Sequence, residues 1–244
     1  MEDQVYRQLY EVENNHWWFA ARKEIILRYL DARLPLPPSA RVLDVGCGTG
    51  AILESFSRRY KAFGTDTAPQ AIEFCRERGL TQLHLGTLDM YPSSEPFDLI
   101  TMLDMLEHVE DDGALLRTGR GLLRAGGHIL IAVPAFPSLW SKHDEILHHK
   151  RRYTRSGLRG LVDRAGFTVE HLTFFNFFLF PPAWLKRVVA RITGSEKAND
   201  LDIPISPLNS IFREVFRLER RILQRASLPV GLSLLCLARK GGNT

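Results

Sequence analysis

Short apolar runs separated by amphipathic segments follow one another through the middle of the chain. Runs of this kind end near Asp44, Asp66, Leu85 and Asp104, and a fifth covers residues 128–133. Apolar runs of four to eight residues are typical of strands that are buried on both faces. Their alternation with helical segments predicts an α/β fold with a parallel sheet and right-handed crossovers.

Both ends of the chain add further elements. Residues 1–34 have a helical pattern that the prolines of Pro35–Pro38 end. A helix is predicted over 154–165, with Thr154 as its N-cap and Gly166 after its end. Strands are predicted over 167–172 and 232–239. The N-terminal helical segment carries one apolar stripe, made of Trp17, Trp18, Ala21, Ile25 and Ile26.

The first apolar run leads into a turn with three alternate glycines. The stretch Val42–Gly50 passes Asp44 and then Gly46, Gly48 and Gly50. Glycine adopts positive φ without strain and lets a ligand approach the backbone closely. A helix that begins near residue 51 would direct its free N–H groups into the same space. The turn therefore predicts a site for a nucleotide-type cofactor.

The same turn allows two cofactor classes. Its spacing fits the loose pattern G-x-G-x-x-G/A, with Ala51 in the last place, which would suit a nicotinamide or flavin enzyme. Asp44 disfavours that interpretation, because a carboxylate near a pyrophosphate costs about 1 to 4 kcal/mol at about 4 Å. A ligand that faces Asp44 should carry positive charge. S-adenosylmethionine has a sulfonium and an ammonium group and has no phosphate.

An acidic residue followed by G-x-G-x-G resembles the first motif of the class I S-adenosylmethionine-dependent methyltransferases. The resemblance implies a Rossmann-like methyltransferase fold, which is a seven-stranded, doubly wound, mostly parallel sheet. Its last strand is antiparallel and forms a hairpin with the sixth. Here about 60 residues separate those two strands, which predicts a helical insertion before the last strand. The cofactor implied is S-adenosyl-L-methionine.

Four later segments extend the resemblance through residue 134. Asp66 lies about 20 positions after the glycine turn, where an acidic residue accepts hydrogen bonds from a ribose. By resemblance, residues 88–90 would surround the adenine and residues 103–108 would lie beneath the methionine part, and the turn at Gly126 and Gly127 matches a third motif. The predicted cofactor residues are Asp44, Gly46, Cys47, Gly48, Gly50, Asp66, Thr67, Leu88, Asp89, Met90, Leu103, Asp104 and His108.

The chain is therefore divided into three parts. Residues 1–38 are predicted to form an N-terminal helical cap, and residues 39–175 with 230–244 the cofactor-binding domain. Residues 176–229 form the insertion, which is the expected substrate region because loops added to a scaffold tend to carry specificity. The aromatic segment Phe174–Leu185 precedes Lys186, Arg187 and Arg191. It is either core or pocket wall, or a segment that contacts a membrane surface.

Charge is distributed unevenly along the chain. Residues 1–140 hold 14 Lys and Arg against 19 Asp and Glu, whereas residues 141–244 hold 18 against 9, within a net charge of +4. The basic half is explained either by solvated helix faces or by attraction to an anionic substrate or lipid headgroup. No platform of interleaved aromatic and basic residues is visible, so no nucleic acid partner is expected.

Candidates for the acceptor side come from two segments that resemble a bacterial small-molecule or lipid-type subgroup of these enzymes. The predicted substrate residues are His16, Trp17, Trp18, Arg22 and Arg152. The residues predicted to act as a base or to position the acceptor are, in falling order, His143, His148 and Tyr153. No metal site is predicted, because no cysteine completes a ligand set near these histidines. The three cysteines form no C-x-x-C pair and predict no disulfide framework.

The sequence thus predicts methyl transfer to an oxygen, nitrogen or carbon of a small-molecule or lipid-linked acceptor. Two alternatives remain, a nicotinamide-dependent oxidoreductase and a non-catalytic membrane-surface binding protein with a degenerate cofactor fold. The polar, acidic start of the chain does not resemble a signal peptide, and no apolar run approaches the roughly 18 residues that span a bilayer. A cytoplasmic location is expected, with peripheral membrane contact left open. The acceptor and the oligomeric state are not identified.

Overall fold

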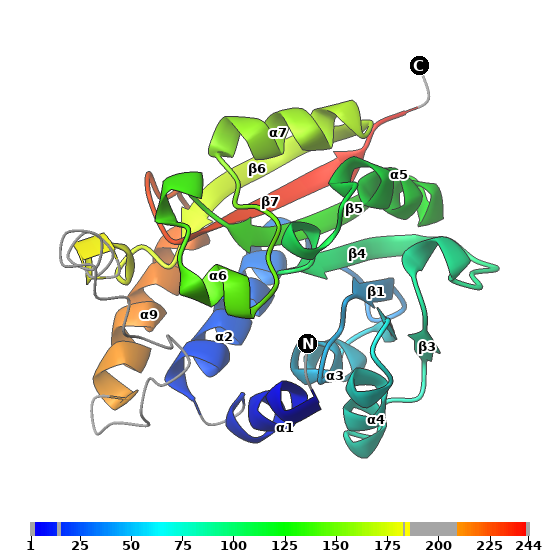
Figure 1. The fold of residues 1–244 in the computed structure, drawn as a ribbon. Helices are drawn as coiled ribbons and strands as arrows, with labels where there is room; N and C mark the ends of the chain where they lie inside the picture. Colours follow the sequence, from blue (N-terminus) through cyan, green and yellow to red (C-terminus); the bar gives the residue numbers. More distant parts are fainter. Residues whose placement is uncertain (1–2, 14–15, 183, 186–208, 243–244) are drawn as a thin grey trace.

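The computed structural model describes the chain except for residues 1–2, 14–15, 183, 186–208 and 243–244. Its centre is a seven-stranded sheet of order β3-β2-β1-β4-β5-β7-β6 (Figure 1). Strands β1 to β5 pair in parallel, and β7 runs antiparallel to both of its neighbours. The strands are β1 Arg41–Val45, β2 Lys61–Asp66, β3 Leu83–Leu85, β4 Phe97–Leu103, β5 Leu123–Pro134, β6 Phe167–Phe175 and β7 Ser233–Lys240.

This topology confirms the predicted methyltransferase sheet, including its antiparallel last strand. The chain leaves β1 toward β2 on one side, and β4 returns to pair with β1 on the other. The carboxyl ends of β1 and β4 therefore lie side by side where the strand order reverses, which is where open α/β sheets bind ligands. Two strands differ from prediction in length. β5 begins at Leu123, and β6 continues to Phe175.

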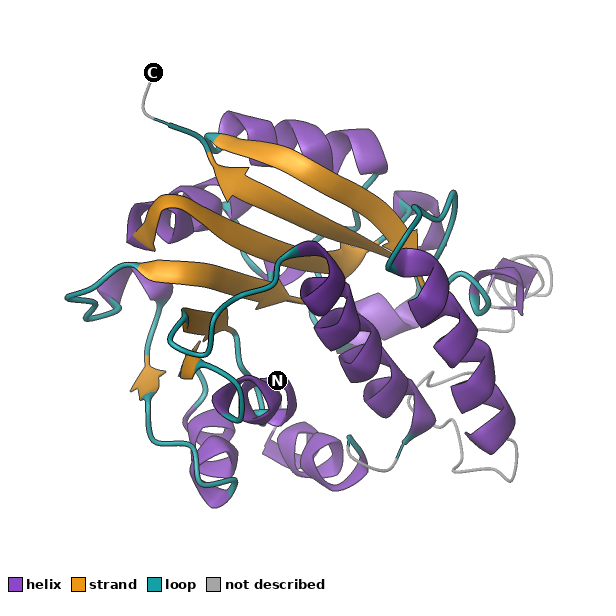
Figure 2. Ribbon diagram, turned by 180° about the vertical axis from the view of Figure 1, so that it is seen from behind, coloured by secondary structure: helices purple, strands orange, loops and turns teal. Residues whose placement is uncertain are grey.

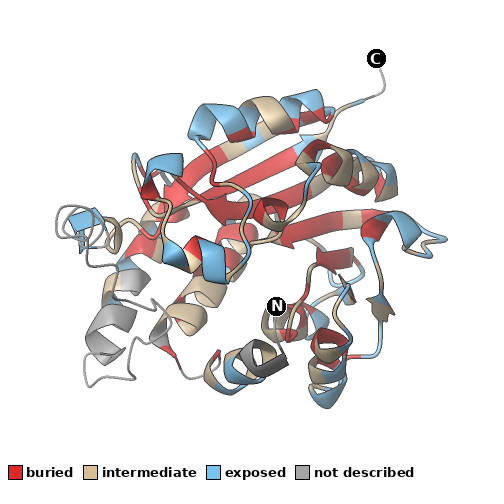
Figure 3. Ribbon diagram, viewed as in Figure 1, coloured by how far each residue is buried: buried red, intermediate tan, exposed pale blue. Residues whose placement is uncertain are grey.

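Helices cover both faces of the sheet. α5 Asp112–Leu122 and α7 Arg155–Arg164 lie over one face (Figure 1), while α2 Trp17–Arg33 and α9 Asn209–Leu223 lie side by side over the other (Figure 2). α3 Ala51–Ser57 packs on β2, and α4 Pro69–Glu77 packs on β2 and β3. Burial is concentrated in the strands between these layers (Figure 3). A short helix, α6 Lys142–Ile146, follows β5.

The N-terminal helical segment consists of two helices instead of one. α1 Asp3–Val12 precedes α2, and His16 caps α2 by accepting a hydrogen bond from the Trp18 N–H at 3.3 Å. The predicted stripe is confirmed for Ala21, Ile25 and Ile26, which are buried against the sheet. The side chain of Trp17 lies outside the described residues. The N-cap of α7 is also confirmed, since the Thr154 hydroxyl accepts from the Gly157 N–H at 3.0 Å.

The region between β6 and β7 contributes to the core of the fold. In α9, Leu223 and Glu219 are fully buried, and Arg220 pairs with Glu24 of α2. Phe174 and Phe175, which the sequence placed in the aromatic segment, are buried residues of β6. Lys186, Arg187 and Arg191 lie outside the described residues. In the part of the chain that the structure describes, no helix is long and apolar enough to cross a membrane.

Candidate functional site

A cavity of about 840 Å³ opens at the carboxyl ends of β1, β2 and β4. Its volume is in the range of small-molecule sites. All predicted cofactor residues except Gly50 and Met90 line it. The lining residues of that set are Asp44, Gly46, Cys47, Gly48, Asp66, Thr67, Leu88, Asp89, Leu103, Asp104 and His108. The structure therefore brings together in one space residues that the sequence spreads over more than 60 positions.

The glycines of the turn have different roles. Gly48 has φ of 53°, and a Cβ built there would meet no atom within 4 Å, so this backbone faces open space that a ligand can fill. Gly50 has φ of 86° and forms the N-cap of α3. A Cβ at Gly50 would lie 2.8 Å from the Cys75 Sγ. Gly50 is thus required for close packing of the turn, and it does not line the cavity.

Two carboxylates stand at the ends of β1 and β2. The Asp66 carboxylate accepts hydrogen bonds from the Gly48 and Ala68 N–H groups, each at 2.9 Å, which fixes it beside the turn. Asp44 is buried and accepts from the Thr101 hydroxyl at 2.5 Å. Burial raises the pKa of Asp44 to about 7, while Thr101 and Arg22 oppose the shift. A bound cation would stabilise the ionised form of this carboxyl.

Helix α1 covers the glycine turn, which the sequence did not predict at residue level. Tyr6, Leu9 and Glu13 of α1 line the cavity. The buried Glu13 carboxylate accepts from the Thr49 hydroxyl at 2.7 and 2.6 Å and pairs with Arg78 of the segment after α4. No local pattern indicates these contacts, because they join residues 36 and 65 positions apart.

Of the predicted acceptor-side residues, Arg22 and His148 line the cavity. Arg22 Nη2 lies 2.7 Å from Asp104 Oδ2. His148 has φ of 56°, so its backbone is held in the left-handed region that few non-glycine residues adopt. Strain of this kind is concentrated at functional sites. His148 is thus the one predicted base candidate that the described structure places on the cavity wall.

The remaining acceptor-side residues lie elsewhere. Tyr153 is buried, and its hydroxyl donates to the Leu106 carbonyl at 3.1 Å and to Asp112 Oδ2 at 2.8 Å. Burial and Asp112 raise the pKa of Tyr153, so this phenol stays protonated. Arg152 is buried and donates to Asp144 at 2.7 Å. Four further predicted residues do not line the cavity: His16, Trp18, Met90 and His143.

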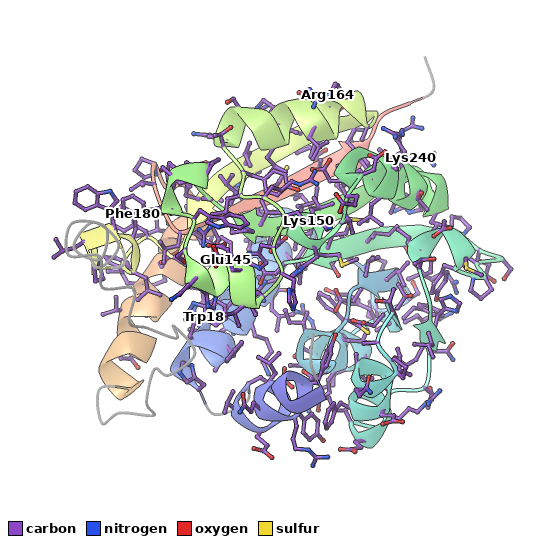
Figure 4. The ribbon with its side chains drawn as sticks, viewed as in Figure 1. Trp18, Glu145, Lys150, Arg164, Phe180 and Lys240 are labelled. Carbon is purple, nitrogen blue, oxygen red and sulfur yellow. The ribbon has the colours of Figure 1, made fainter. Side chains whose placement is uncertain are left out.

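Trp18, which is labelled in Figure 4, packs edge to face on Phe19, a cavity residue, with ring centroids 4.8 Å apart. Met90 is 72% exposed, at the end of the short 3-10 turn Leu88–Met90. Both residues flank the cavity without lining it. A direct role for them would need a change in side-chain position.

The basic run after α6 is neutralised by local partners. Lys150, labelled in Figure 4, pairs with Glu110, and Arg151 pairs with Asp112 at 3.1 Å. Arg152 is held by Asp144 at 2.7 Å. The structure therefore favours the first explanation of this run, since its charges stabilise the loop and offer no unpaired patch to an anion.

A separate cluster joins two loops beside the cavity. Ligand atoms of Glu107, His108 and His149 lie within 4.8 Å of one another. Glu107 is fully buried, and burial together with Asp104 raises its pKa. Burial and His149 lower the pKa of His108 to about 4, so this imidazole is neutral near pH 7. The sequence predicts no metal site. It does not reveal this group, because His149 follows His108 by 41 residues. The three cysteines are free and buried.

Comparison with known families identifies the fold and its strand-end cavity. A family model described as "Methyltransferase domain" matches residues 16–172, which include the glycine turn, the strand-end carboxylates and the loop after α6 that carries His148. The chain belongs to this family of class I S-adenosylmethionine-dependent methyltransferases. Membership of this family contradicts both alternatives, the nicotinamide-dependent oxidoreductase and the non-catalytic membrane-surface binding protein.

Curated relatives agree with this assignment. The chain is 28% identical over 222 residues to a ubiquinone biosynthesis O-methyltransferase of Xanthomonas euvesicatoria pv. vesicatoria, covering 79% of this chain and 90% of the relative. A protein of the same name from Xanthomonas campestris pv. campestris is 33% identical over 134 residues, covering 48% of this chain and 56% of the relative.

Solved structures share the fold at low identity. A methyltransferase in complex with the Haloferax volcanii Trm112 methyltransferase activator has a TM-score of 0.63 at 19% identity, covering 99% of this chain and 96% of that one. The N-methyltransferase NodS of Bradyrhizobium japonicum, in complex with S-adenosyl-L-homocysteine, has a TM-score of 0.56 at 13% identity, covering 94% and 90%.

The residues present fit S-adenosylmethionine. The open space at Gly48 accommodates a ligand against the backbone, and Asp66, which is fixed beside the turn, lines the same cavity. Asp44 and Asp104 place negative charge at the ends of β1 and β4, which suits a cofactor with a sulfonium and an ammonium group. The acidic character of this lining disfavours a phosphate-bearing cofactor.

Proposed function

We propose that this methyltransferase acts on an oxygen of a small-molecule or lipid-linked acceptor, which enters the cavity past His148. The observation that carries the proposal is the extent of the cavity and the residues that line it. One continuous space of about 840 Å³ joins the strand-end carboxylates to His148 and to the apolar residues Leu115, Leu147 and Val109. That lining suits an acceptor with an apolar part.

The protein's contribution to the reaction is binding, orientation and proton removal. Asp44, Asp66 and Asp89 would hold the cofactor, which supplies a methyl group already activated by the positive charge on sulfur. Positioning the acceptor and excluding water would then provide most of the rate enhancement. His148 would accept the hydroxyl proton of the acceptor through its imidazole, a contribution typically worth 10² to 10⁴ in rate.

Two lines of support favour oxygen over nitrogen or carbon as the methylated atom. The curated relatives of this chain are named as O-methyltransferases that act in ubiquinone biosynthesis. A hydroxyl also needs a base near the site of transfer more than an amine does, and the strained backbone of His148 holds an imidazole on the cavity wall.

The proposal is tested with a pair of acceptors that share a phenolic ring and differ only in an apolar tail. Methyl transfer from labelled S-adenosylmethionine is expected for the tailed phenol, with a lower KM than for the phenol without the tail. Transfer to amines alone, with neither phenol methylated, would contradict the proposal.

The location of the acceptor has its own test. Trp184 and Leu185, at the end of the aromatic segment, are about half exposed. If the acceptor is taken from a membrane surface, the protein should co-sediment with anionic vesicles more than with neutral ones, and salt should weaken the association. Equal and negligible sedimentation with both vesicle types would restrict the proposal to acceptors in solution.

A further inference from the structure

Three side chains from two loops converge beside the cofactor cavity. Glu107 and His108 belong to the 3-10 turn Leu106–His108 after β4, and His149 belongs to the loop after α6. The distances between their ligand atoms are all within 4.8 Å. The rings of His108 and His149 meet edge to face with centroids 4.8 Å apart. One carboxylate and two imidazoles are the ligand set of several catalytic zinc sites.

The Glu107 carboxyl group has no hydrogen-bond partner in any other described residue. The residue is fully buried, and neither of its carboxyl oxygens accepts a hydrogen bond from a neighbouring side chain of the described structure. Buried polar groups in proteins are normally hydrogen-bonded or bound to a metal ion. The two nearby arginines lie against other carboxylates. Arg22 Nη2 is 2.7 Å from Asp104 without the geometry of a hydrogen bond, and Arg152 donates to Asp144 at 2.7 Å. A cation at the centre of the cluster would satisfy Glu107.

Both histidine rings are supported by a hydrogen bond to a group outside the cluster. His149 Nδ1 lies 2.9 Å from Asp144 Oδ1, and Asp144 is itself fully buried and fixed by Arg152. This contact keeps the proton on Nδ1 and leaves the Nε2 lone pair of His149 available. The ring of His108 is hydrogen-bonded to the backbone of His148. A carboxylate or carbonyl behind a histidine is the usual outer support of a metal ligand.

We propose that Glu107, His108 and His149 bind one divalent transition-metal ion of the zinc class, with Asp144 orienting His149. Bonds of about 2.0 to 2.2 Å to nitrogen and oxygen would require the three ligand atoms to draw slightly closer than they lie without an ion. His108 also lines the cofactor cavity, so the ion would lie at the cavity wall. Metal binding is independent of the acceptor proposed above. Only a role for the ion in holding the acceptor oxygen rests on that proposal.

The test measures metal binding without cofactor or acceptor. Protein stripped with a chelator is titrated with Zn²⁺ by calorimetry, using the wild type, Glu107→Gln, His149→Asn and the control His171→Asn. His171 is a half-buried histidine of β6 whose ring contacts Tyr29 and Ser227 outside the cluster. We expect one equivalent of Zn²⁺ to bind the wild type and the control. Glu107→Gln and His149→Asn should weaken binding by about a hundredfold or more.

Binding of less than one equivalent by the wild type would overturn the proposal, as would wild-type affinity in either cluster variant. If a variant does not fold, as judged by circular dichroism, substitution of Co²⁺ into the wild type decides. A stoichiometric Co²⁺ spectrum without a thiolate charge-transfer band supports nitrogen and oxygen ligands. A thiolate band, or no stoichiometric spectrum, contradicts them. Because neither measurement involves methyl transfer, their failure would leave the proposed function untouched.

Discussion

The cofactor side of the cavity and its acceptor side are built in different ways. Asp44, Asp66 and Asp104 stand at or directly after strand ends, so the sheet itself brings them to the cavity. His148 and Arg22 reach the same cavity from a loop after α6 and from helix α2, which depend on packing across the molecule. The comparison indicates that the sheet places the carboxylates predicted to bind the cofactor, whereas the residues predicted to face the acceptor are placed by elements added around the sheet.

The largest expected effect separates the two sides at His148. Replacement by Asn should lower kcat on a methylated phenol by about 10² to 10⁴, because the proton acceptor is lost, while affinity for S-adenosylhomocysteine changes little. Steady-state kinetics and calorimetry measure the two quantities. A collapse of cofactor affinity would instead place His148 on the cofactor side of the cavity.

On the cofactor side, Asp66→Ala should weaken S-adenosylhomocysteine binding by roughly tenfold or more. A charge-assisted hydrogen bond is worth about 1.5 to 3 kcal/mol, and the variant also removes the acceptor for the Gly48 N–H. Calorimetry on the folded variant measures the change. Unchanged affinity would show that Asp66 does not contact the ribose.

Asp44 should make cofactor binding depend on pH. Its pKa of about 7 in the free protein means that the carboxyl is increasingly protonated as the pH falls below 7. Binding a cation requires the carboxylate, so affinity for S-adenosylmethionine should fall by up to about tenfold per pH unit below pH 7. The matched variant Asp44→Asn should bind more weakly and lose this dependence. The same slope in both proteins would assign it to another group.

A smaller effect is expected at Tyr153, where the structure indicates support of the fold. Tyr153→Phe removes the hydrogen bonds to Leu106 and Asp112, which should lower the free energy of unfolding by about 1 kcal/mol. Denaturant unfolding measures this loss, and kcat on the phenol serves as the second readout. A drop in kcat of a hundredfold or more with unchanged stability would restore Tyr153 as a base.

The part of the site that could be predicted from sequence is the part whose geometry is local. The turn from β1 into α3 is written in consecutive residues, so Gly46, Gly48 and Asp44 could be placed without any tertiary information. The parallel sheet followed from the order of apolar runs for the same reason, whereas its antiparallel last strand was implied by the family resemblance. Gly50 is an exception. The local pattern predicts a cofactor-binding glycine, but in the structure Gly50 packs against Cys75 and does not line the cavity.

The rest depends on contacts between distant segments. Glu13 reaches Thr49 and Arg78 only after α1 has folded over the turn, and Glu107 meets His149 only through the loop after α6. His143, His148 and Tyr153 lie within eleven residues, yet only His148 lines the cavity. Backbone conformation decides which of several neighbouring polar residues faces a cavity. At His148 that conformation includes a positive φ, which the spacing of residues in the sequence does not encode.

The residues of the cavity lead us to expect that it binds S-adenosylmethionine through the carboxylates at the strand ends. Calorimetric titration of the wild-type protein with S-adenosylhomocysteine, and separately with a nicotinamide dinucleotide, tests it most directly. The structure predicts one equivalent of S-adenosylhomocysteine and no detectable binding of the dinucleotide, whose pyrophosphate would face Asp44 and Asp104. Binding of the dinucleotide with no binding of S-adenosylhomocysteine would show that the cavity is not an S-adenosylmethionine site.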